Sequence, residues 1–439
     1  DPRDGTLDGP GLDWRRYNAE QVTEWVLWEM EPLKRLTPEV PVTTNFMGTH
    51  KFNDYPHLAT HLDLVSQDMY PGYSADHPDL VGTAAAAGFE LDFIRCVAGR
   101  PQRWFTMESA VDSRGLWGGR FPLKPTGMHG LEMVQHLSHG SEGTMYFQWR
   151  KGRGGAEKFH SAVVSHTGGE NTRTFKEVQK WSARHDDLEA ILGSLNRSEV
   201  AVLYDNETRW ATASSEFQRA ANHWGLGGDF YLDHAKDWHR PLWKRGISTD
   251  VVSYDADLDA YKLVLAPLAY MVDGRRAEQL RQFVEQGGTL ASGYYLATVG
   301  GTGLCHTDGC PGLGLDELFG IWSEEFDLLR PGTELRAAPA DGFEGMPPEV
   351  DVSFINGHVH AREAEVLATM DGGLFAGRPL LTRRTCRGGG AAFYLGSIVN
   401  DAALDQLIGH ICREAEVQGW LPGCEPLPHG LTVQTRYDG

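Results

Sequence analysis

Four short apolar runs in the first third of the 439-residue chain alternate with segments of helical periodicity. The runs cover residues 40–47, 62–69, 104–107 and 144–149. Helical spacing of apolar residues marks the segments 14–36, 84–96, 127–137 and 174–192. Strands that alternate with helices at this distance form βα units around a parallel sheet.

Polar side chains collect where these strands end. They are Asn45, Gln67, Asp68, Tyr70, Glu108, Gln148, Trp149 and Arg150. A (β/α)₈ barrel builds its active site at this carboxyl edge. The sequence therefore predicts a barrel, although only four of the eight strands are found.

A second α/β segment follows residue 198. Strands are predicted at 200–204, 250–254, 262–267 and 289–292, with a helix at 275–286. A hairpin at 380–384 and 391–396 and a helix at 402–416 complete the pattern. This order resembles a flavodoxin-like sheet.

The net charge of −20 repels phosphate backbones and anionic membrane surfaces, so we expect neither nucleic acid nor a membrane as a partner. No apolar run has the length of a membrane span. Six scattered cysteines favour a reducing compartment, and we expect a cytoplasmic protein. The segment from Cys305 to Cys310 resembles half of a metal site, but no second Cys/His pair matches it, so no metal is predicted.

Glu108 is the first candidate for chemistry, because it ends an apolar strand where a carboxylate is costly to bury. It is either a nucleophile or general acid/base, or a structural carboxylate paired with Arg103 or Arg114. Glu157 and His160 are the second candidate: three residues apart on a helical turn, they could bind vicinal hydroxyl groups or form an ordinary surface pair.

Tyr70, two residues after Asp68, is either a site phenol or a core residue. Phosphate-loop, Gly-x-Ser-x-Gly and His-Glu-x-x-His patterns are absent. Two carboxylates are then the simplest chemistry, and glycoside hydrolysis is their commonest use on a barrel.

Several collinear motifs sharpen this interpretation: PVTTNFMG at 41–48, LDLVSQDMYP at 62–71, FTMES at 105–109, MYFQWR at 145–150 and RGGAEKFHSAVVSHTG at 153–168. They resemble the second half of the barrel of glycoside hydrolase family 42 β-galactosidases. The segments DLDAYKLVLAPLAYMV and FVEQGGTLASGY are similar to the trimer-forming second domain of that family.

The resemblance implies that Glu108 is the nucleophile of a retaining mechanism, that Tyr70 belongs to the substrate site, and that Glu157 and His160 contact galactose. Trp117 matches the tryptophan on which the sugar lies, with one extra residue in the preceding loop. Gln67 and Met69 stand where the family usually has Trp and Asn, which bears on substrate preference. The resemblance implies no organic cofactor, a β-galactoside as substrate and a homotrimer.

The general acid of the family is the Glu of an Asn-Glu pair on a barrel strand that precedes all of these motifs. The pair Asn206-Glu207 follows the first strand of the second domain, so we interpret it as a loop or interface feature. The chain is therefore expected to be a fragment that lacks the acid and the family's cysteine cluster for zinc.

The expected fold class is α/β, with residues 1–195 as the C-terminal half of a TIM (β/α)₈ barrel. Residues 196–418 are expected to form the flavodoxin-like trimerisation domain, and 419–439 the start of a small β domain. Two alternatives remain at this point: a related β-L-arabinosidase or β-D-fucosidase, and a non-catalytic sugar-binding or assembly subunit.

Overall fold

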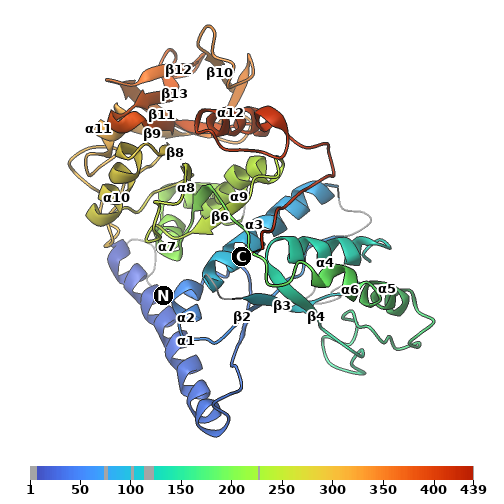
Figure 1. The fold of residues 1–439 in the computed structure, drawn as a ribbon. Helices are drawn as coiled ribbons and strands as arrows, with labels where there is room; N and C mark the ends of the chain where they lie inside the picture. Colours follow the sequence, from blue (N-terminus) through green and yellow to red (C-terminus); the bar gives the residue numbers. More distant parts are fainter. Residues whose placement is uncertain (1–6, 74–77, 100–102, 113–122, 226–227, 439) are drawn as a thin grey trace. The chain divides into compact units, whose positions relative to one another are not determined.

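The computed structural model describes residues 7–73, 78–99, 103–112, 123–225 and 228–438 (Figure 1). It divides into two compact units. The first, called the barrel unit below, comprises residues 19–197 with the segment from residue 429 onward. The second, the sheet unit, comprises residues 198–428 with the segment up to residue 18.

The barrel unit is built on a four-stranded parallel sheet in the order β1-β2-β3-β4. The strands are β1 (Asn45–Phe46), β2 (Val65–Asp68), β3 (Trp104–Ser109) and β4 (Ser141–Tyr146). The helices are α2 (Tyr55–Ala59), α3 (Leu80–Ala98), α4 (Met128–Ser138), α5 (Arg173–Ser182) and α6 (His185–Glu189). The parallel βα arrangement that the sequence predicts is confirmed.

Several elements of the barrel unit differ from the prediction, and the strand expected at 144–149 lies three residues earlier, as β4. The expected strand at 40–47 forms a ladder only at Asn45 and Phe46, and Pro41 has no N–H to donate to a ladder. The expected helix at 174–192 is two helices: α5 ends at Ser182 with Ala183 as its C-cap, and α6 begins at His185 with Arg184 as its N-cap.

The sheet unit contains an eleven-stranded mixed sheet whose parallel part has the order β14-β8-β7-β5-β6. These strands are β5 (Val200–Leu203), β6 (Thr249–Val252), β7 (Leu263–Ala266), β8 (Thr289–Gly293) and β14 (Ala391–Leu395). Read from the β6 edge in order of appearance along the chain, this is the 2-1-3-4-5 order of flavodoxin-like folds. The predicted fold class is confirmed.

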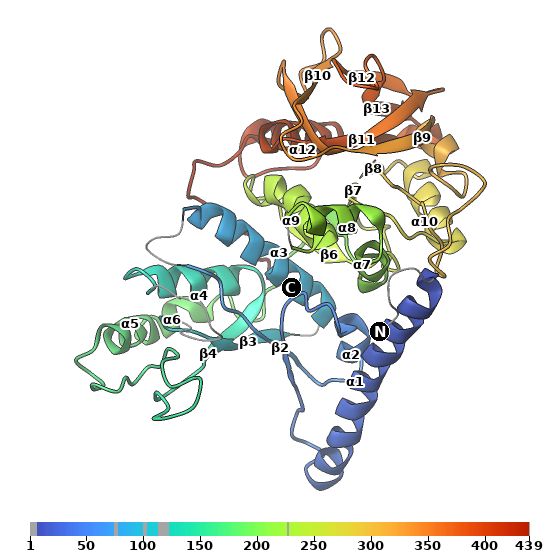
Figure 2. The same ribbon diagram turned by 180° about the vertical axis from the view of Figure 1, so that it is seen from behind.

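Both faces of the parallel strands are covered by helices. On one face, Val264 and Leu290 pack with the buried side chains Leu280 and Phe283 of α10 (Gly274–Glu285) and with α11 (Leu315–Phe319). Residues one position along each strand face the other way. On that side the ring of Phe393 approaches His410 of α12 (Asp401–Glu414), and α12 accompanies α9 (Phe230–Trp243; Figures 1 and 2).

An antiparallel extension continues the sheet beyond β14 and is absent from the sequence-based prediction, apart from the hairpin strand β13. It consists of β9 (Ile321–Leu328), β10 (Leu335–Pro339), β11 (Val350–Ala361), β12 (Glu365–Met370), β13 (Pro379–Thr385) and β15 (Ser397–Val399). Its strands alternate buried and exposed residues only in part, as β9 shows, so the sequence carries a weak strand signal there.

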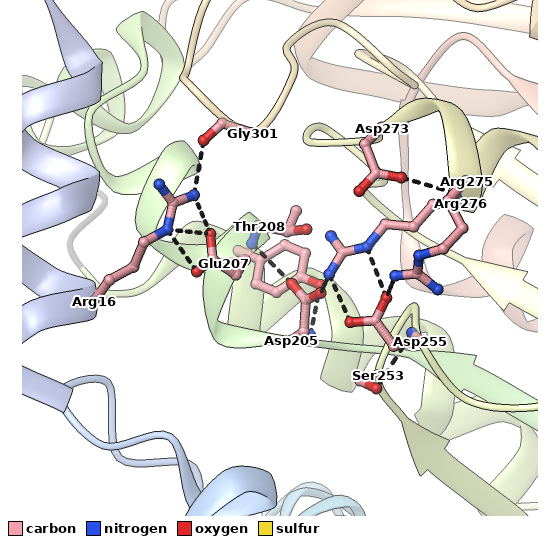
Figure 3. A network of polar contacts seen from close by, with 11 residues as sticks. Arg16, Asp205, Glu207, Thr208, Ser253, Asp255, Asp273, Arg275, Arg276 and Gly301 are labelled. Atoms are coloured by element: carbon pink, nitrogen blue, oxygen red, sulfur yellow. Dashed lines mark hydrogen bonds and ion pairs between the residues drawn. The ribbon is translucent and has the colours of Figure 1, made fainter. Parts of the chain in front are cut away.

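Helix α1 (Asp8–Leu36) contributes its first residues to the sheet unit. There the Arg16 guanidinium donates from Nε to Glu207 Oε1 at 2.8 Å and from Nη2 to the Gly301 carbonyl oxygen at 2.7 Å (Figure 3). Glu207 lies in the first turn of α7 (Asn206–Ala213), which Asp205 caps by accepting from the Thr208 N–H. The Asn206-Glu207 pair is thus part of a packing contact.

The last described residues run along the barrel unit. Tyr437 exchanges backbone hydrogen bonds with Leu195, and the Arg436 guanidinium lies 3.1 Å from a carboxylate oxygen of Glu142. None of the helices within the described ranges combines the length and the apolar character needed to cross a membrane.

Candidate active site

Glu108 owes its position to an irregularity in β3. Gln67 of β2 pairs with Thr106, but the next residue of β2, Asp68, pairs with Glu108, so β3 carries one extra residue at this point. The ladder with β4 is also displaced here. Such a bulge bends the strand and re-aims the side chain that follows, and it brings the half-buried Glu108 level with Asp68 at the carboxyl edge.

Tyr70 holds the Glu108 carboxylate. The phenol of Tyr70 donates a hydrogen bond to Glu108 Oε2 at 2.6 Å. Burial and then the neighbouring carboxylate of Glu108 raise the pKa of Tyr70 far above its usual range. The phenol therefore stays protonated and remains a hydrogen-bond donor to the Glu108 carboxylate.

Asp68 is a second carboxyl group at the same edge. It accepts a hydrogen bond from Asn45 Nδ2 at 2.6 Å, so β1, β2 and β3 each contribute a polar side chain. Burial raises the pKa of Asp68 to about 6, the hydrogen bond from Asn45 lowers it, and the charge of Glu108 raises it. At neutral pH Asp68 is thus mostly ionised, with a larger protonated fraction than an ordinary aspartate has.

Glu157 and His160 lie in the loop after β4, on a turn closed by a hydrogen bond from the His160 N–H to the Glu157 carbonyl at 2.9 Å. The predicted turn is confirmed. The following residues return alongside the end of β4, because Gln148 and Ser161 are joined by a backbone hydrogen bond of 3.0 Å. The glycine at 155, with a φ of 80°, permits this tight path.

The buried ring of His160 packs edge-on against the Tyr70 ring, with 5.6 Å between centroids, and against Phe147 at 5.0 Å. Burial lowers the pKa of His160, although the carboxylates of Glu157 and Glu108 oppose this. The imidazole is therefore neutral at neutral pH, with one ring nitrogen as donor and the other as acceptor. Glu108, Tyr70, His160 and Glu157 thus form one constellation.

A buried ion pair lies behind β3 and was not identified from the sequence. Lys124 Nζ lies 2.5 Å from Glu132 Oε2 on α4 and donates to the Ala110 carbonyl at 2.6 Å, while Ser109 Oγ donates to Glu132 Oε1 at 2.7 Å. Burial raises the pKa of Glu132, and Lys124 opposes the rise. Because Ser109 and Ala110 directly follow Glu108, this pair fixes the end of the strand.

The loop after β3 is fixed a second time through Asp112. Its N–H donates to Ser161 Oγ at 2.7 Å, and its carboxylate accepts from Arg173 Nη2 at 2.7 Å. Asp112 therefore has a structural role and links the loops that follow β3 and β4.

The remaining predicted residues have different outcomes. Trp117 and Arg114 lie outside the described residues. Among the described residues Arg103 forms no ion pair with Glu108, whose carboxylate accepts from Tyr70 instead, so the alternative of a structural pair with Arg103 is not supported. Gln67 is buried beside Met69, with 3.6 Å between Gln67 Nε2 and Met69 Sδ.

The Cys305 to Cys310 segment does not assemble a metal site with the side chains that the structure describes. All six cysteines are free, and His306 Nε2 lies 2.9 Å from the Val272 carbonyl. Near Glu108 the available chemistry consists of carboxylates, a phenol and a neutral imidazole. Such groups suit nucleophilic attack and hydroxyl recognition.

Comparison with known proteins agrees with this geometry. The family model described as β-galactosidase matches residues 5–188, and the model described as β-galactosidase trimerisation domain matches residues 198–418. The chain belongs to the glycoside hydrolase family 42 β-galactosidases. The second match alone covers half of the chain.

The relatives that match this chain are longer proteins. A β-galactosidase from Alicyclobacillus acidocaldarius is 34% identical over 432 residues, which are 98% of this chain and 61% of that protein. One from Clostridium perfringens is 35% identical over 437 residues, with 98% and 61% covered. The structure of a β-galactosidase from Rahnella sp. R3 matches with a TM-score of 0.91 and 34% identity over 100% of this chain and 63% of that one. This chain thus spans about three-fifths of the length of these relatives.

Proposed function

We propose that this chain carries the nucleophile half of a retaining β-galactosidase. The observation that carries the proposal is the 2.6 Å hydrogen bond from Tyr70 to Glu108 at the carboxyl edge of a parallel barrel sheet. It orients one carboxylate oxygen and leaves the other available for attack. Membership of family 42 supports galactose as the sugar.

In the proposed first step, a Glu108 oxygen attacks the anomeric carbon while the bond from that carbon to the leaving oxygen breaks. A general acid protonates the leaving oxygen, and a galactosyl ester of Glu108 results. Water then attacks the anomeric carbon, loses a proton to the conjugate base of that acid, and releases galactose with retained configuration.

The general acid is proposed to come from outside this chain. A retaining pair requires carboxyl groups about 5 to 5.5 Å apart. We do not assign the general acid to Glu207 of the Asn206-Glu207 pair, because its carboxylate is bound by the Arg16 guanidinium in the sheet unit. Asp68 is the second carboxyl group beside Glu108, but its Oδ2 accepts from Asn45.

Substrate recognition is assigned to the loop after β4. A carboxylate accepts hydrogen bonds, whereas a neutral imidazole both donates and accepts. Glu157 and His160 together can therefore bind two adjacent hydroxyl groups of a sugar. Trp117 is proposed from the family resemblance to lie against the apolar face of the galactose ring.

A series of aryl β-galactosides and lactose tests whether the chain supplies the nucleophile but not the general acid. Dinitrophenolate leaves without a proton, whereas the glucose of lactose requires one. We expect the 439-residue chain to release dinitrophenolate, to leave lactose intact, and to lose all release in Glu108→Gln. Hydrolysis of lactose as fast as of the dinitrophenyl substrate would place an acid within the chain and contradict the proposal.

The same series distinguishes the alternatives. No release from any galactoside, in the parent chain and in Glu108→Gln alike, would favour a non-catalytic sugar-binding or assembly subunit. Faster release from β-L-arabinosides or β-D-fucosides than from β-galactosides would change the assigned sugar and retain the mechanism.

We also propose a homotrimer formed through the sheet unit, supported by the match of residues 198–418 to a trimerisation domain. A cytoplasmic location is proposed because all six cysteines are free thiols, which a reducing compartment preserves. The boundaries 1–195, 196–418 and 419–439 are kept as the proposed domain limits.

A further inference from the structure

Strands β9 and β11 of the sheet unit lie beside each other (Figure 2) and pair antiparallel. Together they carry a cluster of two histidines and a glutamate. Glu324 comes from β9, and His358 and His360 come from β11. The two histidines are two residues apart, so their side chains leave the same face of the strand. The pairing is irregular between Gly357 and Val359, opposite the β9 segment that contains Glu324.

We propose that Glu324, His358 and His360 bind a divalent transition-metal ion of the zinc class. The three potential ligand atoms lie within 4.8 Å of one another. Glu324 Oε2 is 2.9 Å from His360 Nε2 and 3.5 Å from His358 Nδ1. Bonds of about 2.0–2.1 Å in a tetrahedron place ligand atoms roughly 3.3 Å apart, so small movements complete the site.

The ring nitrogens of His358 independently support a metal ligand at this position. Both are buried, and neither forms a hydrogen bond with the residues that the structure describes. A neutral imidazole carries one N–H and one lone pair, and leaving both unsatisfied in a buried place is unfavourable. A metal on Nδ1 would use the lone pair that no protein donor uses.

The rings are also held in place before any ion arrives. His360 stacks on Trp322 with centroids 4.1 Å apart and planes 6° apart, and His358 stacks on Phe375 at 4.6 Å and 16°. Glu325 Oε1 lies 3.6 Å from His358 Nδ1, at the margin of this group of three. Two imidazoles with carboxylate oxygens form a donor set that suits zinc.

Arg378 is expected to oppose metal binding by His360. Its Nη1 lies 3.3 Å from His360 Nδ1, which favours the tautomer with the proton on Nε2, the atom assigned to the metal. Binding requires the proton to move to Nδ1 and the exposed Arg378 to turn away. Arg378→Gln is therefore expected to tighten binding several-fold, whereas Glu324→Gln weakens it at least tenfold.

Equilibrium dialysis of the chelator-treated 439-residue chain with zinc chloride tests these two opposite effects. His410→Gln is the matched control: His410 Nε2 lies 3.7 Å from Glu414 Oε2 on α12, and these two join no third His, Cys, Asp or Glu in a ligand group among the described residues. This control should leave zinc affinity unchanged. Equal affinity in the parent chain, Glu324→Gln and Arg378→Gln would overturn the proposal.

X-ray absorption at one equivalent of zinc separates this site from the free cysteines. The proposal predicts a first shell of nitrogen and oxygen at about 2.0–2.1 Å, whereas cysteine binding gives sulfur at about 2.3 Å. A sulfur shell at one equivalent would assign the ion to the cysteines and overturn the proposal. Neither measurement depends on glycosidase activity.

Discussion

At the scale of single residues, the contact between Tyr70 and Glu108 is the most informative one. Tyr70→Phe removes the phenol donor and leaves the ring against His160. Hydrogen bonds to charged groups contribute about 1.5–3 kcal/mol, so we expect dinitrophenyl galactoside release to fall roughly 10- to 100-fold. The rate of release under single-turnover conditions measures this loss.

Tyr73→Phe is the control for this change. Tyr73 is buried in the same unit, and its hydroxyl donates to Gln135 Oε1 at 2.6 Å, away from Glu108. The control should retain the release rate. Equal losses in the two variants would show that the effect of Tyr70 is one of general packing.

Asp68 predicts a specific pH dependence of stability. Burial raises its pKa from 3.8 to about 6, so the folded state binds more protons than the unfolded state between these values. The contribution of Asp68 to the free energy of unfolding therefore falls as pH rises through this window. In urea unfolding from pH 4 to 7, the unfolding free energy of the parent chain minus that of Asp68→Asn should therefore fall as the pH rises.

Asp237 provides the comparison for Asp68. Burial also raises its pKa to about 6, but it lies on α9 in the sheet unit. Asp237→Asn should remove its own share of the pH dependence and leave that of Asp68. Parallel pH curves for Asp68→Asn and the parent chain would contradict the assignment.

Much of the candidate site could be predicted residue by residue, because strand ends identify Glu108, Asp68 and Tyr70 without coordinates. The bulge in β3 could not be predicted, because an apolar run does not reveal that one residue in it lacks a partner in the neighbouring strand. The buried Lys124–Glu132 ion pair could not be predicted either, because charged residues in a loop and on a helix are ordinarily exposed to solvent.

At the scale of elements, the Lys124–Glu132 pair holds the end of β3 to α4. Lys124→Met leaves the fully buried Glu132 without its cation. Removing one partner of a buried pair costs about 3–5 kcal/mol of unfolding free energy. Urea unfolding checks this, and the double variant Lys124→Met/Glu132→Gln should recover part of the loss.

The exposed pair Arg184–Asp187 sets the lower reference for that measurement. Arg184→Met should cost about 0–1 kcal/mol. A Lys124→Met variant as stable as Arg184→Met would show that Glu132 is neutral or hydrated in the folded chain.

The attachment of α1 to the sheet unit gives a second prediction for elements. Arg16 and Glu207 are about one-third exposed, so Glu207→Gln should cost about 1 kcal/mol or less and leave galactoside chemistry unchanged. Arg276→Met, which leaves Asp205 buried without its cation, should cost about 3–5 kcal/mol. Lactose hydrolysis by the parent chain that a folded Glu207→Gln variant loses, while it still releases dinitrophenolate, would instead identify Glu207 as the acid.

The regular elements were predictable because their periodicity is strong, as in α10 and the four buried residues of β7. The extension from β9 to β12 was not, because its strands mix exposed and buried positions irregularly. The proximity of Glu324 to His358 could not be predicted from the sequence, because it results from the pairing of β9 with β11.

At the scale of the whole molecule, the trimerisation match predicts the assembly state. Light scattering coupled to size exclusion should give three times the 48.6 kDa chain mass. A monomer at every accessible protein concentration would contradict the proposed homotrimer.

The central claim is that Glu108 forms a covalent bond to galactose. A 2-fluorinated dinitrophenyl β-galactoside tests it most directly, because the fluorine slows hydrolysis of the ester and the leaving group needs no acid. We expect one 2-fluorogalactosyl group per chain by intact mass, located on the Glu108 peptide and absent from Glu108→Gln. Labelling of Asp68 or Glu157, or undiminished labelling of Glu108→Gln, would contradict it.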